Sequence, residues 1–434
     1  MELFQQQLAP SASLKIAGGL LVLVSLPFLH VLGGTQLILL AAATAVSVHV
    51  YRAPESVVVA GPLFILAVNV FFPSAARFDP SNTVPAWEMR YWAVGLLLIT
   101  GAALLRLRSQ AWRKLPRSLK FFLIAALAAS VFGAARGNDI SYVARQLFGS
   151  VLLVAYFAFA QHFSNEDNFC QSMRTYALPC VTAFVLYYAW VFPERGLHKE
   201  LTNLPTQTCI LAILFAGQGG RRSRLVSAVM MIPPVLLIER RALAGYFLAV
   251  VLIWTLQSTS RLQRWSLTLA SAAIVVFSLV PSLGTMLLEK APGTSALAVW
   301  LPDGAYDTSS LQDRAIQLVE AGLILRRSPI LGDGMGSELS WLSAARGDMQ
   351  QAYIDNGWAY VAVKMGLFGV ASFAWFLWVI LKKVSRNSVA LSASLLSMLL
   401  LVMFTEPVFF QFTSAPLLGV VCGFLYRKQP LLAV

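Results

Sequence analysis

The sequence predicts an all-α, polytopic transmembrane protein with about 12–14 helices and one large helical loop outside the membrane. Two features of the composition lead to this fold class: of 434 residues, 58% are hydrophobic, and only 12% are charged. That charged share is about half of the usual value for a soluble globular protein. A soluble fold cannot hide so much apolar surface, whereas helices in a bilayer satisfy their own backbone groups and face lipid. The composition excludes a cytosolic enzyme, a disordered chain and a disulfide scaffold.

The third observation is that apolar segments long enough to cross a bilayer, about 20 residues each, recur along the whole chain. Their ranges are 14–33, 35–51, 56–72, 91–107, 121–135, 146–163, 175–192, 204–217, 225–238, 242–257, 266–287, 356–381, 388–405 and 408–426. The shorter segments between 204 and 238 alternatively form half-helices. The chain is therefore divided into transmembrane helices in 1–287, one long hydrophilic loop in 288–354, and C-terminal transmembrane helices in 355–434.

The distribution of basic residues predicts the orientation of these helices. With a cytoplasmic amino terminus, the cytoplasmic loops hold more than twice as many Lys and Arg residues as the short outer loops. By the positive-inside rule, both termini lie in the cytoplasm and the long loop lies on the outer side. The first apolar segment resembles a signal anchor, because a polar head precedes it and no cleavage motif follows. The net charge of +13 suits anionic membrane lipids, and no basic-aromatic stripe outside the apolar segments favours nucleic acid.

The loop 288–354 contains a well-marked amphipathic helix. Its apolar positions recur at helical spacing in Leu311, Ala315, Leu318, Val319, Gly322 and Leu323. A capping-box-like Ser310 starts this helix, and Pro329 ends it after two arginines in the last turn. The glycine-rich segment 329–336 follows no strand, so it predicts a plain turn rather than a nucleotide site. The stretch 337–351 is expected to form a second short helix, and the loop can then cover a site at the bilayer surface.

Arginines on the outer side are candidate binding residues, because the positive-inside rule does not account for them. Arg145 opens the span 146–163, Arg240 and Arg241 occupy a short outer turn, and Arg314 lies on the loop helix. A guanidinium presents a planar fork of donors that fits two phosphate oxygens. Arg145, Arg241 and Arg314 together therefore suit a lipid-linked diphosphate, with Arg240 in support. Alternatively, Arg145 only extends to the interface from a helix end, Arg314 lies on a solvated face, and Arg240 pairs with the preceding glutamate.

Asp355 is the candidate general base, because it lies just outside the membrane at the start of the helix 356–381. Asp is also a preferred N-cap, so capping is the alternative role, and one residue can do both. Asn356 follows as a supporting residue, and Lys364 lies about 13 Å further along the helix. A buried ammonium is costly unless it is paired or reaches water, so Lys364 is expected to line the cavity or to bind an acidic group.

Neither a metal site nor a cofactor is predicted. Three of the four cysteines lie inside apolar segments, the fourth lies in a short polar connection, and no two form a CxxC pair. This placement is typical of buried thiols. The outer side also lacks an Asp-x-Asp-like metal motif.

Several of these features resemble the O-antigen ligase and Wzy-type O-antigen polymerase superfamily. The family has an arginine at the outer end of a middle span, which Arg145 matches, and a Ser-Arg-small motif at an outer turn, which 240–242 matches. Its long periplasmic loop late in the chain has an Arg-led helix and a Pro-Ile-Leu-Gly-x-Gly turn, matched by Arg314 and 329–334.

The family's loop ends with a His-Asn pair before a helix that contains Gly-Leu-x-Gly. Asp355-Asn356 and the segment 366–369 match this arrangement, so the motifs together cover roughly residues 140–370. Two positions depart from the pattern: Arg240 replaces the serine, and Asp355 replaces the histidine. Because that histidine is typical of ligases, its replacement favours a polymerase and leaves the identity of the base open.

The resemblance implies a GT-C-like fold and a metal-independent glycosyltransferase in the bacterial inner membrane. The enzyme would move a glycan from undecaprenyl diphosphate to a sugar hydroxyl on the periplasmic face. The expected function is an O-antigen or exopolysaccharide polymerase, with a chain-length regulator as a further partner. The alternative within this chemistry is an O-antigen ligase that acts on lipid A core or protein. The alternative from another class is a polysaccharide or lipid transporter or flippase, although the sequence has no evident internal repeat.

Overall fold

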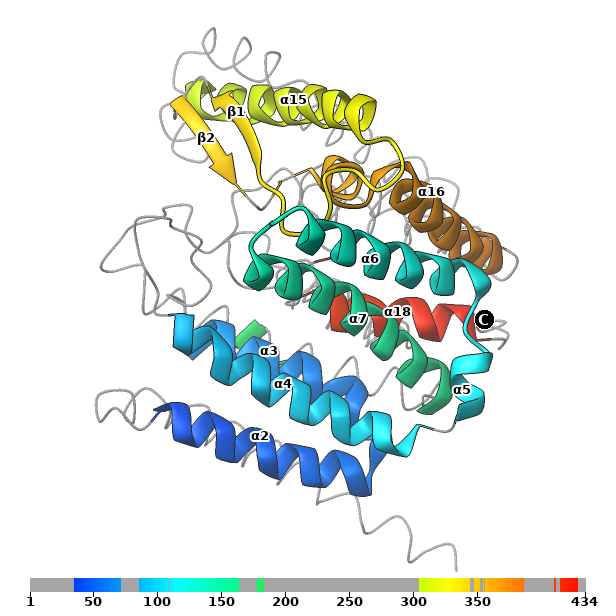
Figure 1. Cartoon of the computed structure of the whole chain (residues 1–434). Coiled ribbons are helices and arrows are strands. Elements are labelled where there is room, and N and C mark those ends of the chain that lie inside the picture. Colours follow the sequence, from blue (N-terminus) through cyan, green and yellow to red (C-terminus); the bar gives the residue numbers. More distant parts are fainter. Residues whose placement is uncertain are drawn as a thin grey trace, which may run out of the picture.

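The computed structural model describes a predominantly helical protein (Figure 1). Three helices, over Arg117–Ala135, Ile140–Phe163 and Gly357–Lys383, are long and apolar enough to cross a membrane. The described residues are 35–71, 86–107, 109–163, 178–179, 181–182, 304–343, 347–351, 354, 356–385, 410 and 414–427. The predicted segments within 14–33, 175–287 and 388–405 lie wholly or almost wholly outside these residues.

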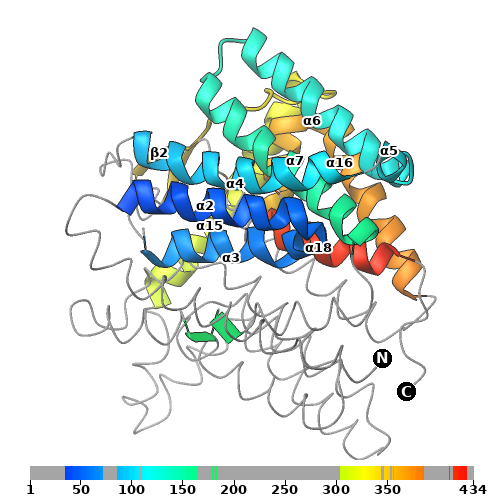
Figure 2. The same ribbon diagram turned by 90° about the horizontal axis from the view of Figure 1, so that it is seen from below.

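Three apolar helices form one side of the described structure, as the view from below shows (Figure 2). They are α2 (Thr35–Arg52), α3 (Val57–Phe71) and α4 (Ala86–Arg106), with the short 3₁₀-helix η3 (Pro54–Ser56) between α2 and α3. Small residues allow close packing, because Gly95 of α4 lies against the ring of Phe64 and the side chain of Ala43. The predicted segments 35–51, 56–72 and 91–107 are thus confirmed as helices.

The helices α6 (Arg117–Ala135) and α7 (Ile140–Phe163) form a hairpin at the centre of the structure, after the short α5 (Ser109–Arg113). Asp139 begins α7, since its side chain accepts hydrogen bonds from the backbone N–H and the hydroxyl of Ser141, both at 2.7 Å. These bonds lower the pKa of Asp139 from its ordinary value. The predicted spans 121–135 and 146–163 are confirmed as helices, and both begin earlier than predicted.

The last two described helices, α16 (Gly357–Ser385) and α18 (Ala415–Tyr426), pack on this hairpin. Gly419 and Gly423 let α18 approach the α7 backbone, because a Cβ on either residue would overlap a carbonyl oxygen of α7. Aromatic rings fill the space between the helices; the buried ones are Phe122, Phe157, Phe373, Phe376 and Phe410. Exposed apolar side chains remain on the outward faces of α6 and α16, as expected where helices meet lipid.

The long loop contributes α15 (Gly304–Arg327) and an antiparallel hairpin of β1 (Leu339–Ser343) and β2 (Gly347–Gln351). The predicted second helix in 337–351 is therefore wrong. In β1, buried Leu339 and Trp341 alternate with exposed Ser340 and Leu342, which is the period of a strand. The stretch is too short for a helical pattern to override this alternation.

The amphipathic helix in the loop is confirmed, and it ends at Arg327 as predicted. It begins at Gly304 rather than at the predicted Ser310, and the side that it buries differs from the apolar stripe. Leu318, Val319 and Leu323 are exposed, whereas the buried positions are Gln317, Ala321 and Ile324. The buried face packs on α16 and β1. The described leucine and valine side chains of the stripe thus face away from the described helices.

Candidate functional site

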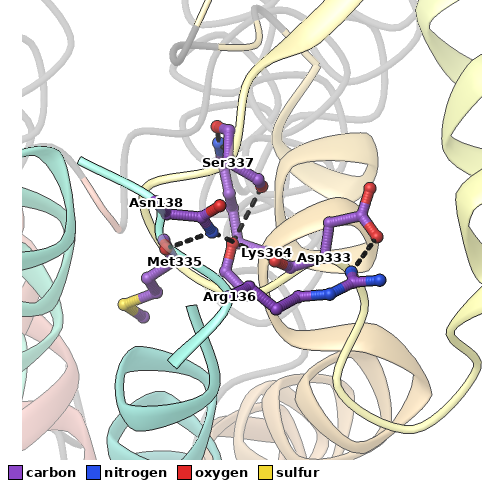
Figure 3. Close-up of polar contacts among 7 residues, drawn as sticks. Arg136, Asn138, Asp333, Met335, Ser337 and Lys364 are labelled. Carbon is purple, nitrogen blue, oxygen red and sulfur yellow. Dashed lines mark hydrogen bonds and ion pairs between the residues drawn. The ribbon is translucent and has the colours of Figure 1, made fainter. Parts of the chain in front are cut away.

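The turn that connects α15 to β1, residues 328–337, is held by the connection between α6 and α7 (Figure 3). The amide of Asn138 donates to the carbonyl oxygens of Asp333 and Met335 at 3.1 and 3.0 Å. The guanidinium of Arg136 forms an ion pair with the carboxylate of Asp333, at 2.6 Å. The backbone N–H of Met335 donates to the carbonyl of Ala129 on α6, at 3.0 Å. The second half of the turn is therefore fixed against α6 and the α6–α7 connection, whereas Pro329 and Ile330 are exposed.

Glycine is required where this turn meets α6. Gly334 has φ of 84°, in the left-handed region that side chains disfavour. A Cβ on Gly334 would lie 2.5 Å from the Cα of Gly133, and a Cβ on Gly133 would overlap the carbonyl oxygen of Met335. The glycine-rich sequence thus serves close packing of two backbones. This finding agrees with the expectation that the motif forms a turn.

The helix α16 is broken at Gly366, whose φ of 63° and ψ of −162° are far from helical values. The same turn binds the backbone groups that the break releases. Asp333 N–H donates to the carbonyl of Val363 at 2.8 Å. Leu367 N–H and Phe368 N–H donate to the carbonyls of the turn's own Pro329 and Ile330, at 2.8 and 3.2 Å. Broken helices are tolerated at membrane depth when protein groups satisfy them in this way.

Lys364 is fully buried, and its ammonium is bound to the end of the turn (Figure 3). The ammonium donates to the carbonyl oxygen of Ser337 and lies 3.4 Å from the Ser337 hydroxyl. The expectation that Lys364 lines a cavity or binds an acidic group stays a prediction, and the partner that the structure describes for this ammonium is Ser337. These oxygens offset part of the cost of burying the charge.

Arg145 lies in the second turn of α7, close to the same connecting turn. Its guanidinium is half-buried, and it lies 5.7 Å from the ring centroid of Tyr142. The next residue, Gln146, is buried and accepts a hydrogen bond from Gly336 N–H at 2.7 Å. Arg145 thus directly precedes the residue that binds the segment leading into β1, and its own side chain lies over Tyr142.

The start of α16 shows which residue caps this helix. The side-chain oxygen of Asn356 accepts hydrogen bonds from Trp358 N–H at 3.0 Å and Ala359 N–H at 2.9 Å. Asn356 is therefore the N-cap of α16. Asp355 itself lies outside the described residues, but the capping role predicted as its alternative is filled by its neighbour.

The structure brings two of the predicted site segments together. Gln317 of α15 lies against the start of α16, with its side-chain oxygen 3.5 Å from the backbone nitrogen of Asn356. Arg314 belongs to the same helix, three residues earlier, and its side chain lies outside the described part. Arg240 and Arg241 also lie outside the described residues. The helix that carries Arg314 thus contacts the residue that follows Asp355.

Sequence reasoning missed the structural roles of several residues in this region. Gln317 could have been found as a polar residue between apolar positions of an amphipathic helix, and Gly366 as a glycine inside a membrane span. The roles of Asn138 and Gln146 depend on contacts with residues almost 200 positions away, and no local pattern indicates them. Among the described residues, no group of three or more His, Cys, Asp or Glu is placed to hold a metal ion.

Comparisons with known proteins give no assignment for this arrangement. No protein-family model matches the chain, and no curated protein matches it significantly.

Proposed function

We propose that the protein is a membrane glycosyltransferase that moves a glycan from a polyprenyl diphosphate to a sugar hydroxyl at the outer membrane surface. The observation that carries this proposal is the contact between Gln317 of α15 and Asn356 at the start of α16. It links the helix of Arg314, a candidate phosphate-binding residue, to the residue that follows the candidate base Asp355. A transfer site needs fixed cations and a proton acceptor within reach of one substrate.

In the proposed reaction, the oxygen of the acceptor hydroxyl attacks the anomeric carbon of the donor sugar. The bond from that carbon to the diphosphate oxygen breaks, and its electron pair leaves with the lipid diphosphate. Asp355 takes the hydroxyl proton and later releases it to water. Arg145, Arg241 and Arg314 stabilise the charge that develops on the leaving diphosphate.

Contacts between polar residues at the two ends of the α6–α7 hairpin support the predicted orientation. Asp333 of the long loop pairs with Arg136, and both were predicted to lie on the outer side. At the opposite end of the hairpin, Gln161 of α7 donates to the carbonyl of Lys114 at 3.4 Å. Segments predicted on the same side of the membrane are therefore neighbours, as a bacterial inner-membrane protein with a periplasmic site requires.

The polymerase is preferred over the ligase because Asp355 stands where the family's ligases have histidine. The transporter alternative gains no support from Lys364, because its ammonium is buried and donates to the carbonyl oxygen of Ser337.

Purified protein incubated with lipid-linked repeat units, with and without lipid A core, tests this function. A ladder of products without core is expected for a polymerase, whereas a single transfer that requires core would identify a ligase. The absence of any transfer under both conditions would contradict the proposal.

Arginine variants test the site in the same assay. Arg145→Ala and Arg241→Ala should each abolish transfer, and Arg241→Lys should keep only a little activity because a point charge replaces the planar fork. Wild-type rates in either alanine variant would remove that arginine from the site. Arg327→Ala, in the exposed last turn of α15, is the matched control and should retain activity.

A further inference from the structure

The connection between α4 and α6, residues 106–120, contains six basic residues and no acidic one. The nearest acidic residues along the chain are Glu88 and Asp139. Arg113, Lys114 and Arg117 are exposed, and within the described part of the chain no ion pair involves them. The positive-inside rule explains why such a loop is basic, but it does not require the loop to be ordered.

This connection is held in place by its own hydrogen bonds. The ammonium of Lys120 on α6 donates to the carbonyl oxygen of Arg113 at 3.1 Å. The side-chain amide of Gln161 on α7 donates to the carbonyl oxygen of Lys114 at 3.4 Å. Leu115, the next residue, is buried. The backbone of Arg113 and Lys114 is therefore fixed against α6 and α7, while both side chains stay at the surface.

The same contacts bring Arg117 close to Arg113, although the short helix α5 ends between them. Arg117 is the first residue of α6, and Lys120 lies one helical turn later on the same face of that helix. Because Lys120 binds the carbonyl of Arg113, the three exposed cations Arg113, Lys114 and Arg117 form one group around this bond. We call this group the basic turn.

The basic turn lies where a membrane-spanning helix begins. The helix α6, which is long and apolar enough to cross a membrane, starts at Arg117, and α5 lies at the end of the bundle with the carboxyl end of α16 (Figures 1 and 2). Trp112, directly before Arg113, is 37% exposed. Tryptophan is enriched at the level of lipid headgroups, because its ring is apolar and its N–H is polar.

We propose that the basic turn binds the phosphate of an anionic phospholipid, with the exposed ring of Trp112 beside the glycerol and the acyl chains. Positive charge without an acidic partner fits a phosphate, and the fixed backbone lowers the entropy that ordering the site would cost. The exposed tryptophan at the start of a span favours a lipid over a soluble anion. The inference does not depend on the proposed glycosyl transfer, so failure of either one leaves the other standing.

The test titrates phosphatidylglycerol or phosphatidylcholine into the full-length protein in detergent micelles and follows the melting temperature. Phosphatidylglycerol should stabilise the wild-type protein more. The double variant Arg113→Gln/Arg117→Gln should bind phosphatidylglycerol about tenfold or more weakly, while its affinity for phosphatidylcholine changes less than about twofold. Lys120 is left intact, because its ammonium supports the connection.

Two further measurements separate a site from a general effect of charge or folding. Arg326→Gln/Arg327→Gln is the matched control, because it removes two exposed arginines from the last turn of α15, and it should bind phosphatidylglycerol within about twofold of the wild type. Modification of Lys114 by an amine-reactive reagent, followed by mass spectrometry, needs no variant. Phosphatidylglycerol, but not phosphatidylcholine, should slow this modification in the wild-type protein.

Equal stabilisation of the wild-type protein by the two lipids, with Lys114 modified at the same rate in both, would overturn the inference. An equal loss of phosphatidylglycerol binding in the two double variants would also overturn it, because the lipid would then respond to net charge alone. Protection of Lys114 by inorganic phosphate, with none added by phosphatidylglycerol, would identify a soluble anion in place of the lipid.

Discussion

At the scale of single residues, Asn138 and Arg136 hold the same turn by different means. The Asn138 amide gives one hydrogen to each of two carbonyl oxygens in a partly buried place. The ion pair of Arg136 with Asp333 is largely open to solvent, with the two side chains 44% and 30% exposed. Hydrogen bonds in partly buried places contribute more to stability than solvated ion pairs, which are weakened by screening.

We therefore expect Asn138→Asp to destabilise the protein by about 2 kcal/mol or more, because a carboxylate would face two carbonyl oxygens. Arg136→Gln should cost less than about 1 kcal/mol. Melting temperatures of the two variants in detergent check this order. An equal loss in both variants would show that the ion pair is as important as the amide.

Asp355 tests whether catalysis and capping are separate at the start of α16. Because Asn356 already caps the helix, Asp355→Asn should leave the melting temperature nearly unchanged. The same change removes the proposed proton acceptor, so transfer should fall by about 100-fold or more. Rates and melting temperatures measured on one preparation check both parts. Activity close to that of the wild type would assign the base to another residue.

At the scale of elements, the break in α16 depends on Gly366. Its φ of 63° is strained for any other residue, and a Cβ there would overlap the carbonyl oxygen of Ile330. Gly366→Ala should destabilise the protein by about 1–3 kcal/mol. Gly101→Ala is the control, because no atom lies within 4 Å of that position in α4, and it should be neutral or slightly stabilising. Retention of the folded peak in size-exclusion chromatography after heating measures both.

The helices and strands show which features of the fold the hydrophobic pattern of the sequence predicts. The length of the apolar segments predicted helices α6, α7 and α16, because a bilayer imposes that length on any spanning helix. The break at Gly366 was missed because hydropathy is insensitive to backbone torsion. In 337–351 the helix prediction overlooked the alternation of Leu339 and Trp341 with exposed neighbours. In α15 the sequence predicts the apolar stripe, but it does not indicate whether protein or lipid covers that stripe.

At the scale of the whole molecule, different polar contacts hold the two ends of the described helix bundle. One end holds the turn 328–337 and the α6–α7 connection, where Arg136 meets Asp333. The other end holds the carboxyl ends of α16 and α18, where the ammonium of Lys383 lies 3.7 Å from the ring centroid of Tyr426. The charge count in the loops predicted this separation. The polar contacts that hold each end could not be predicted, because they join segments distant in sequence.

Cysteine labelling can assign these ends to the two sides of the membrane. Glu338 and Lys382 are exposed at opposite ends, so Glu338→Cys should react with an impermeant maleimide in intact spheroplasts. Lys382→Cys should react only after permeabilisation. A background variant without the four native cysteines is needed. Labelling with the reverse pattern would invert the orientation and place the site in the cytoplasm.

The anchoring of the turn 328–337 has a mechanical consequence for α15. Because the turn after its carboxyl end is bound to α6, α7 and α16, a tilt of this helix has its pivot near Ser328 and must also shift its contacts with β1 and with the start of α16. The backbone of Arg314 lies about 20 Å along the helix from this pivot. A tilt of about 10° therefore moves it by about 3 to 4 Å, roughly one hydrogen-bond length. Under the proposed function, a small tilt of α15 would therefore be enough to bring this cation to the diphosphate or to withdraw it.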